Sequence, residues 1–504
     1  MPNVCFGMTL SVWRFLADKD QASFAISCGD SNAAQTLDQD YHLGTLLDSN
    51  DLQSIENTAY LGPGSSARLL EQILKSAVNW HSTNNAQLPK KLVPDDPSRL
   101  IQQQNLHRPK LFFITYEQRR SELHYLVPRS TQRAIIEHHL KVVSPEYNIF
   151  SAEQEWSFLS YENPLKWSSS NTEDPGAFAL TVVFAVSTAL ASRDLDTNLS
   201  VVAIRCREEV QKLSQRASSF EDQVEAMRWT CTALCALSLC ELINPTGQLW
   251  ELLGRAASTL EQFLDYLRLR NSSPGSDFQR LELLLLKLES SAALHFGRPS
   301  RLCAVRLGTI VEDSSAPPSM SDDLNILIHL YKISQAFQGC PNPSKEFLES
   351  LIPPTLQVSS QYSDTSMSLA ILYIALHPLF TDSDLWCGGT LDEPSSKLFG
   401  IIANSASTFI DRYAQLNGSS KIISLWMAAE KLLEAGGIWA AYVIHGRRTA
   451  LPGERFFADM AMSVAMGPTM KVSSLLASFA ARWKSGSAYV DAWECLIELL
   501  WNML

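Results

Sequence analysis

The stretch LWELLGRAASTLEQFLDYL at residues 249–267 indicates how this chain folds. Its apolar side chains recur at steps of three and four residues, which places them on one face of an α-helix. Such a face must pack against another element, because it exposes a continuous apolar stripe. The stretch therefore predicts an amphipathic helix on a hydrophobic core. Its apolar stripe consists of Leu249, Leu252, Leu253, Ala256, Leu260, Phe263, Leu264 and Leu267.

The next segment repeats the pattern and carries signals for both of its ends. Asp277 lies near its start, where a side-chain oxygen can cap free backbone N–H groups. Gly297 and Pro299 follow its last apolar residue, and this order is typical of a helix end. We therefore expect a second amphipathic helix over about 277–296. Its stripe consists of Leu281, Leu284, Leu285, Leu288, Ala292 and Phe296.

Helical patterns continue through the chain from about residue 127 to its end. Turn residues such as Pro245, Pro274-Gly275 and Gly467-Pro468 separate them. No run of alternating apolar and polar residues indicates strands, and no fixed period indicates a solenoid. We expect an all-α fold, with one large multi-helix domain over 127–504. The other predicted helices are 177–192, 198–216, 221–243, 321–338, 345–361, 365–377, 395–416, 420–444, 471–484 and 487–503.

The front of the chain differs from this helical part. Residues 1–57 hold eight Asp or Glu against two basic residues and show no long helical period, so they form an irregular acidic N-terminal segment. Residues 58–126 are rich in turn residues and are interpreted as a linker region. Within them, the turn Gly62–Ser66 precedes a predicted helix, Ala67–Trp80. That turn lacks the lysine of a phosphate-binding loop, so a plain turn is favoured over an anion site.

Composition limits the classes of function. The 504 residues are 46% hydrophobic and 19% charged, as in ordered globular proteins. The net charge of −12 disfavours binding to nucleic acid or to an anionic membrane surface. The N-terminus shows no basic region ahead of its apolar residues, so no signal peptide is expected. The uncharged run Gly176–Ser192 spans 17 residues, fewer than the roughly 20 that cross a bilayer, and is interpreted as a buried helix.

Ten cysteines are scattered along the chain without a C-x-x-C pair, which argues against a disulfide framework and for a reducing compartment. Cys231 and Cys235 are expected to pack as small hydrophobic residues on one apolar helix.

No motif predicts catalysis, a cofactor or a metal, so we assign no catalytic, cofactor-binding or metal-binding residue. His138 and His139 are adjacent and would point about 100° apart on a helix, unlike a metal-binding i, i+4 pair. His295 lies on the apolar side of its helix and is expected to be a satisfied core residue. The acidic pairs Glu208-Glu209 and Asp322-Asp323 are interpreted as surface or capping acids. An enzyme would need a set of residues dispersed over distant helices.

Several segments, in chain order, resemble the fungal-specific transcription factor domain, the middle homology region of zinc-cluster regulators. Tyr60–Ser66 is similar to its aromatic-x-Gly-Pro-Ser-Ser element, and Leu126–Phe150 resembles its opening helix. Phe178–Ser192 looks like its small-residue helix. Val224–Leu267 resembles its next helical pair, joined here through Gly247-x-x-Trp250. Leu294–Pro299 is similar to the closing Gly-Arg-Pro element, although the Trp, Tyr and Asp-Arg that usually precede it are replaced by Leu283, Leu286 and Glu289-Ser290. The resemblance covers about residues 58–300.

The DNA-binding module of that family has no counterpart at the front of this chain. The module uses six cysteines to share two zinc ions, whereas residues 1–57 contain only Cys5 and Cys28 and are acidic. Specific DNA binding by the chain alone is therefore not expected. Either the protein works through a DNA-bound partner or the chain lacks a first exon.

The resemblance implies a nuclear transcription regulator of a fungal gene set, most naturally one for secondary-metabolite biosynthesis. Its partners would be other transcription regulators or DNA-bound proteins, its DNA contact would be indirect or weak, and a small-molecule effector would fit the helical domain. No membrane association, no cofactor and no enzymatic activity are expected. Two alternatives remain: a helical scaffold or adaptor without a transcriptional role, and an enzyme with a dispersed site.

Overall fold

In the computed structural model, the described part of the chain is helical. It comprises residues 123–170, 174–192, 197–216, 222–270, 275–296, 300, 302, 329–333, 370–377, 391, 393–449, 455–483 and 486–501. Helices account for 86% of these residues and none of them lies in a strand, so the all-α prediction is confirmed. The acidic segment 1–57, the linker region 58–126 and the predicted helix Ala67–Trp80 lie outside the described residues, apart from the end of the linker, 123–126.

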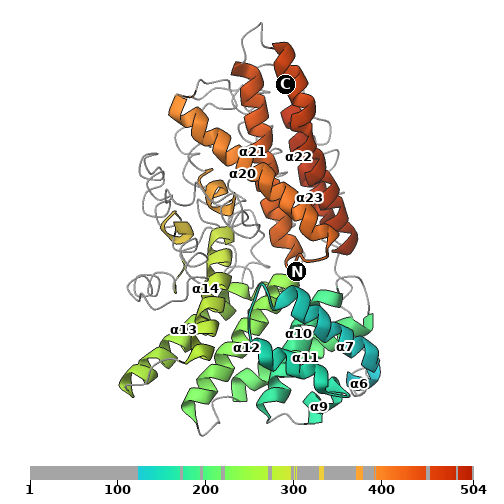
Figure 1. Ribbon diagram of the computed structural model, residues 1–504, viewed down its shortest axis with the longest axis vertical. Coiled ribbons are helices and arrows are strands. Elements are labelled where there is room, and N and C mark those ends of the chain that lie inside the picture. The colour runs from blue at the N-terminus through green and yellow to red at the C-terminus, as the bar shows by residue number, and fades with distance from the viewer. Residues whose placement is uncertain are drawn as a thin grey trace, which may run out of the picture.

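The helices α6 to α14 share one hydrophobic core, and we call them the first bundle. In Figure 1 they occupy the lower half, in cyan to yellow-green. Helix α10 contacts α7, α9, α11 and α12, and α12 in turn contacts α13 and α14. The bounds are α6 Leu123–Leu126, α7 Arg129–His138, the π-helical turn η3 His139–Val143, α8 Ala152–Ser157, the 3₁₀ turn η4 Phe158–Ser160, α9 Pro164–Ser170, α10 Pro175–Ala191, α11 Thr197–Arg216, α12 Gln223–Ile243, α13 Leu249–Leu269 and α14 Ser276–Phe296.

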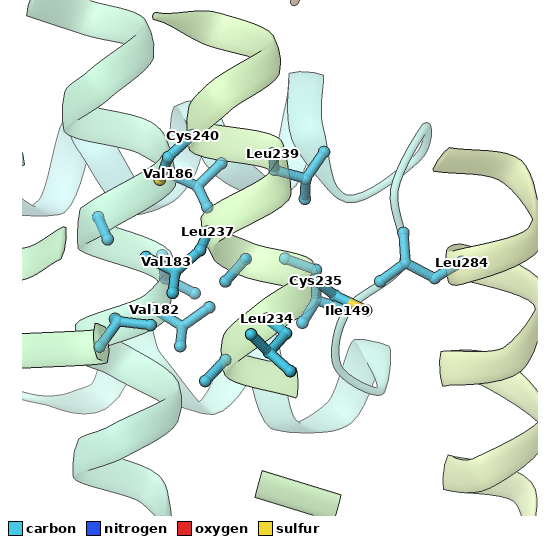
Figure 2. Close-up of a cluster of buried hydrophobic side chains, with 14 of the residues drawn as sticks. Ile149, Val182, Val183, Val186, Leu234, Cys235, Leu237, Leu239, Cys240 and Leu284 are labelled. Atoms are coloured by element: carbon cyan, nitrogen blue, oxygen red, sulfur yellow. The ribbon is translucent and has the colours of Figure 1, made fainter. Parts of the chain in front are cut away.

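Helices α10 and α12 form the centre of the first bundle. Fourteen residues of each are buried, so neither helix has a solvent face of ordinary width. Figure 2 shows the side chains of Val182, Val183 and Val186 of α10 beside Leu234 and Leu237 of α12. Two buried hydroxyl groups inside these helices donate to the carbonyl four residues earlier: Thr181 to Ala177 and Ser238 to Leu234, at 2.8 Å each. This bond satisfies a buried hydroxyl without a partner from another helix.

The helices α20 to α23 share a second core, to which residues 370–376 also contribute, and we call this the second bundle. The bounds are α20 Glu393–Gly418, α21 Leu425–Thr449, α22 Arg455–Arg482 and α23 Ser487–Trp501. Helices α21 and α23 approach each other closely at one point. A Cβ atom built on Gly436 would lie 2.6 Å from the ring of Trp493, so glycine is what lets the indole approach the backbone.

The two bundles meet where α21 begins. Ile423, just before α21, and Trp426 in its first turn belong to the core of the first bundle. The Trp426 indole N–H donates to the carbonyl of Leu242, near the end of α12, at 2.8 Å. In Figure 1 this junction lies between the green and orange-red helices.

The predicted apolar stripes are largely confirmed. Every stripe residue of α13 is buried, and in α14 all but Phe296 are buried. The capping prediction for Asp277 is wrong, because its carboxylate accepts from the guanidinium groups of Arg228 and Arg280 instead. Gly297 and Pro299 lie outside the described residues.

Two predicted boundaries also need correction. Helix α21 begins at Leu425 and not near residue 420, because 419–424 turn the chain and Ser420 adopts a positive φ of 55°. Gly467-Pro468 does not separate two helices, because α22 continues through Pro468. An internal proline removes one helical hydrogen bond and costs roughly 3 kcal/mol, but α22 packs against α20, α21 and α23, which holds the helix together. Of the predicted helix 345–361 nothing is described, and of 321–338 only residues 329–333 are.

One described helix, α12, is long and apolar enough to cross a membrane by length and composition. Its window has a mean hydropathy of 1.3, but 78% of that window is buried inside the protein. A core helix passes the same test, and the contacts of α12 with α10, α11, α13 and α14 are those of a core helix. The run predicted to be a buried helix, 176–192, corresponds to α10 and is buried.

Candidate functional site

Three histidine–carboxylate contacts are buried in the described part of the chain. They join His139 to Glu155, His295 to Glu430 and His377 to Glu434. Each of these side chains is at most 5% exposed. Burying such groups costs free energy unless they are paired and hydrogen-bonded. A buried histidine–carboxylate contact therefore lowers stability unless it is well paired, and such a cost points to a structural or a chemical role.

The first contact is built around a π-helical turn. At the end of α7 the backbone widens into η3, where the Ser144 N–H donates to the carbonyl of His139 at 3.0 Å. The His139 ring lies between α10 and α8, with Nδ1 2.9 Å from the Ser187 hydroxyl and Nε2 3.5 Å from a Glu155 oxygen. The contact between Nε2 and Glu155 is not a hydrogen bond, whereas Ser144 donates to the other oxygen of Glu155.

Ser187, His139 and Glu155 are the residue types of a hydrolase triad, in which histidine activates a serine and a carboxylate orients the histidine. Their setting does not suit that chemistry. All three are at most 1% exposed, and Ser187 lies in the middle of the fully packed helix α10. A substrate carbonyl could reach the hydroxyl only if the helices separated. We therefore interpret this cluster as a set of polar contacts that joins η3, α8 and α10.

The second contact lies at the junction of the two bundles. His295, in the last turn of α14, places Nε2 2.9 Å from one oxygen of Glu430 on α21. The hydroxyl of Tyr489, on α23, donates to the other oxygen at 3.0 Å. The indole of Trp426 meets the His295 ring edge to face, with centroids 4.7 Å apart. We call His295, Glu430 and Tyr489 the junction cluster. It holds three helices from two cores.

The His295 ring is only half satisfied within the junction cluster. It is 3% exposed, and its Nδ1 has no hydrogen-bond partner. The expectation that His295 is a core residue is confirmed, but the expectation that it is satisfied is wrong at this nitrogen. A buried polar atom without a partner costs about 1–3 kcal/mol. The junction is therefore less stable than its close packing alone would suggest.

The third contact lies one helical turn further along α21. The Glu434 carboxylate lies 3.2 Å from Nδ1 of His377 and 2.5 Å from the Lys431 ammonium. Burial acts to raise the pKa of Glu434, but Lys431 and the hydrogen-bonded His377 outweigh it and hold that pKa well below its ordinary value. Glu434 is therefore an ionised structural partner of the second bundle and not a proton donor.

Four cysteines in the first bundle are free thiols, and all are buried. Burial raises the pKa of Cys206 and of Cys240 to about 12. The pKa of Cys235 is also raised, first by its hydrogen bond with Cys231 and then by burial. Because the thiolate is the reactive form, these thiols are poor nucleophiles and poor metal ligands. This confirms the prediction that Cys231 and Cys235 pack as small hydrophobic residues.

Among the described residues, no group of three or more His, Cys, Asp or Glu side chains is placed to hold a metal ion. His138 is only partly buried whereas His139 is buried and faces Ser187, so the adjacent pair does not converge, as predicted. Glu208 is exposed and Glu209 pairs with Lys212, as expected of surface acids. Asp322 and Asp323 lie outside the described residues.

No family model, no curated protein and no solved structure matches this chain. Its function must therefore be argued from its own residues and their geometry.

The residues that the sequence analysis missed are the carboxylates opposite the histidines. Glu430 and Glu434 are four residues apart in a helix whose other residues on that face are apolar, such as Trp426 and Leu433. Acids within an apolar stripe are the signal that could have identified them, because a buried carboxylate requires a partner. Their partners could not be identified, since they come from other helices distant in the sequence.

Proposed function

We propose that this chain is the helical regulatory region of a fungal-type transcription regulator that acts in the nucleus through other regulators. One observation carries the proposal. Segments resembling the fungal-specific transcription factor domain occur in the family's order, and their described parts are α7 with η3, α10, α12 with α13, and the end of α14. These elements all contribute to the core of the first bundle. Segments of one domain need such a common core.

The charge of the chain supports recruitment by protein contacts. A net charge of −12 opposes the approach of a phosphate backbone. A regulator of this kind reaches its genes by binding a DNA-bound protein, and its own DNA contact is indirect or weak. The resemblance points to a secondary-metabolite gene set as the target.

The buried setting of the polar clusters argues against an enzyme with a dispersed site. Catalysis requires that a substrate reach the reacting groups, whereas the histidines and carboxylates described above are at most 5% exposed. Regulation requires only that two packings of the helices differ in affinity for a partner or a small-molecule effector.

The test combines transcript profiling of a deletion strain with chromatin occupancy of the tagged protein. We expect the tagged protein in the nucleus, altered transcripts of a coherent gene set, and restoration of those transcripts by the wild-type gene. Unchanged transcripts together with a protein excluded from the nucleus would contradict the proposal and favour a scaffold or adaptor.

A second experiment tests indirect recruitment. Purified chain is incubated with a library of random DNA duplexes, and bound sequences are read after washes at increasing salt concentration. We expect weak binding without sequence preference that disappears as salt rises, because only non-specific charge contacts are available. Enrichment of one sequence by the isolated chain would refute indirect recruitment. So would chromatin occupancy that persists in a strain lacking its partner regulators.

A further inference from the structure

The helices within each bundle are packed differently from the way in which the two bundles pack against each other. Within a bundle, helices lie alongside one another, as α10 does with α11 and α21 with α22. Among the described helices, none of the first bundle lies alongside one of the second (Figure 1). Contact passes instead through individual side chains. Ile423 and Trp426 are buried in the first core, and Leu294 packs against the second. Trp483, just after α22, packs against both cores. The relative position of the bundles therefore depends on a few residues.

The junction cluster is the polar part of that contact, and no protonation state satisfies all of it. If His295 is charged, it neutralises Glu430, but its Nδ1–H has no acceptor. If His295 is neutral and donates through Nε2, the carboxylate keeps an uncompensated buried charge, because its two donors, His295 Nε2–H and the Tyr489 hydroxyl, are both neutral. If Glu430 is protonated and donates to Nε2, the proton sits on Nδ1 and again lacks an acceptor. In every protonation state, the closed junction thus contains either a buried N–H without an acceptor or an uncompensated buried charge.

Opening the junction removes this penalty, because water can solvate both the carboxylate and the imidazole. Separating an apolar interface has no such compensation, since each Å² of exposed apolar surface costs about 25 cal/mol. A buried ion pair therefore fixes the register of two surfaces while adding little net stability. A contact that fixes the register but adds little net stability allows the junction to exist in a closed and an open state. By contrast, Glu434 is held by Lys431 and His377, and all three belong to the second bundle or its core.

We propose that His295, Glu430 and Tyr489 form a polar latch that sets the position of the first bundle relative to the second and opens without either bundle unfolding. This inference rests on the proposed regulatory function in one respect: the open and closed latch are the two packings between which an effector or partner selects. The opening and closing of the latch itself follows from the geometry of the junction alone.

The test measures the distance between spin labels placed one in each bundle. Leu269 at the end of α13 and Met470 on α22 are 85% and 67% exposed, so labels there should not disturb the cores. The labels are attached to an unnatural keto amino acid, which avoids the native cysteines, and the distances are measured by electron double resonance on the full chain.

We expect one main distance in the wild type, with the open state a minority of about 0.1–10%. Glu430→Ala leaves both ring nitrogens of His295 without partners in the closed state, so the second distance should become the major one. Tyr489→Phe removes one hydroxyl and should also increase the population of the open state, but by less than Glu430→Ala does. The apolar pair His295→Leu with Glu430→Leu should give a narrower distribution than the wild type, because no polar group remains to be solvated on opening.

Glu434→Gln is the matched control, because Glu434 is a buried, histidine-bound acid one turn away on the same helix. It should lower stability but leave the distance between the labels unchanged, and far-UV circular dichroism checks that each variant is folded. The latch is refuted if Tyr489→Phe and a folded Glu430→Ala both keep the wild-type distribution. It is also refuted if Glu434→Gln shifts the distances as much as Glu430→Ala does, or if the apolar pair opens like Glu430→Ala.

The same variants in the transcript assay separate the latch from the proposed function. Shifted distances with unchanged transcripts would leave the latch in place and contradict the regulatory function. Unchanged distances would remove the latch whatever the transcripts do.

Discussion

Replacing Gly436 with alanine measures how closely α21 and α23 are packed. The added Cβ would lie 2.6 and 2.7 Å from two ring carbons of Trp493 and 3.3 Å from a methyl group of Val472. Carbon atoms prefer about 3.5–4.0 Å, so the indole would have to move by most of an ångström. It has little freedom to do so. Trp493 is 1% exposed, and its N–H donates to the Ser473 hydroxyl at 2.8 Å.

Two opposing effects set the size of the change. Overpacking a filled core costs about 1–3 kcal/mol, whereas alanine stabilises the helix over glycine by about 1 kcal/mol. The net loss should be about 0–2 kcal/mol. With a urea slope of about 1–3 kcal/mol per molar, a loss of about 1 kcal/mol would lower the unfolding midpoint of the second bundle by roughly 0.3–1 M.

Urea unfolding followed by far-UV circular dichroism provides the assay. Gly446→Ala, on the same helix, is the matched control, because a Cβ there meets no atom within 4 Å. The control should equal or exceed the wild type in stability. If Gly436→Ala is as stable as Gly446→Ala, the indole does not press on the backbone and the close-packing argument is wrong.

Three further outcomes follow from the buried groups. Cys206 and Cys240, whose pKa values are raised to about 12, should resist alkylation at pH 8 in the folded protein and react once it is unfolded in urea, as read by peptide mass spectrometry; labelling at the native rate of an exposed thiol would contradict their burial. His139→Leu leaves the buried Ser187 hydroxyl without its histidine partner. It should cost about 1–3 kcal/mol of unfolding free energy, measured by urea titration, and a loss below 1 kcal/mol would mean that the contact is unimportant. The pKa of Glu434 is lower in the folded than in the unfolded chain, so the ionised carboxylate stabilises the fold fully above the ordinary pKa of 4.5 and progressively less as the pH falls below 4.5. The difference in unfolding free energy between the wild type and Glu434→Gln should therefore shrink in acid. A difference that grows in acid would show that the pKa is raised and not lowered.

Local spacing was sufficient to predict most helices but not their contacts. The stripe of α13 was predictable because the interval between apolar residues alone determines the buried face. Pro468 was misread because a local rule for proline takes no account of the helices on either side of α22. The turn before Leu425 was missed for a similar reason, since Ser420 gives no glycine signal for its positive φ.

The candidate site was less predictable than the fold. The Trp426 indole and the Leu242 carbonyl are 184 residues apart in the chain, and nothing in either neighbourhood specifies the other. His295 could be placed on a buried face but its partner could not, because Glu430 and Tyr489 come from helices that only the tertiary packing brings together. Ser187 gave no signal, because a serine in an apolar helix most often bonds its own backbone.

The burial of most of α12 bears on how the protein is made and handled. During synthesis this segment leaves the ribosome before α13 and α14 exist to cover it, and the mean hydropathy of its apolar window is 1.3. Until residue 296 has left the ribosome, the apolar surface of α12 is exposed to chaperones and to other nascent chains. Expression fragments that stop between residues 244 and 296 would keep that surface permanently bare, and they should precipitate where fragments ending beyond α14 do not.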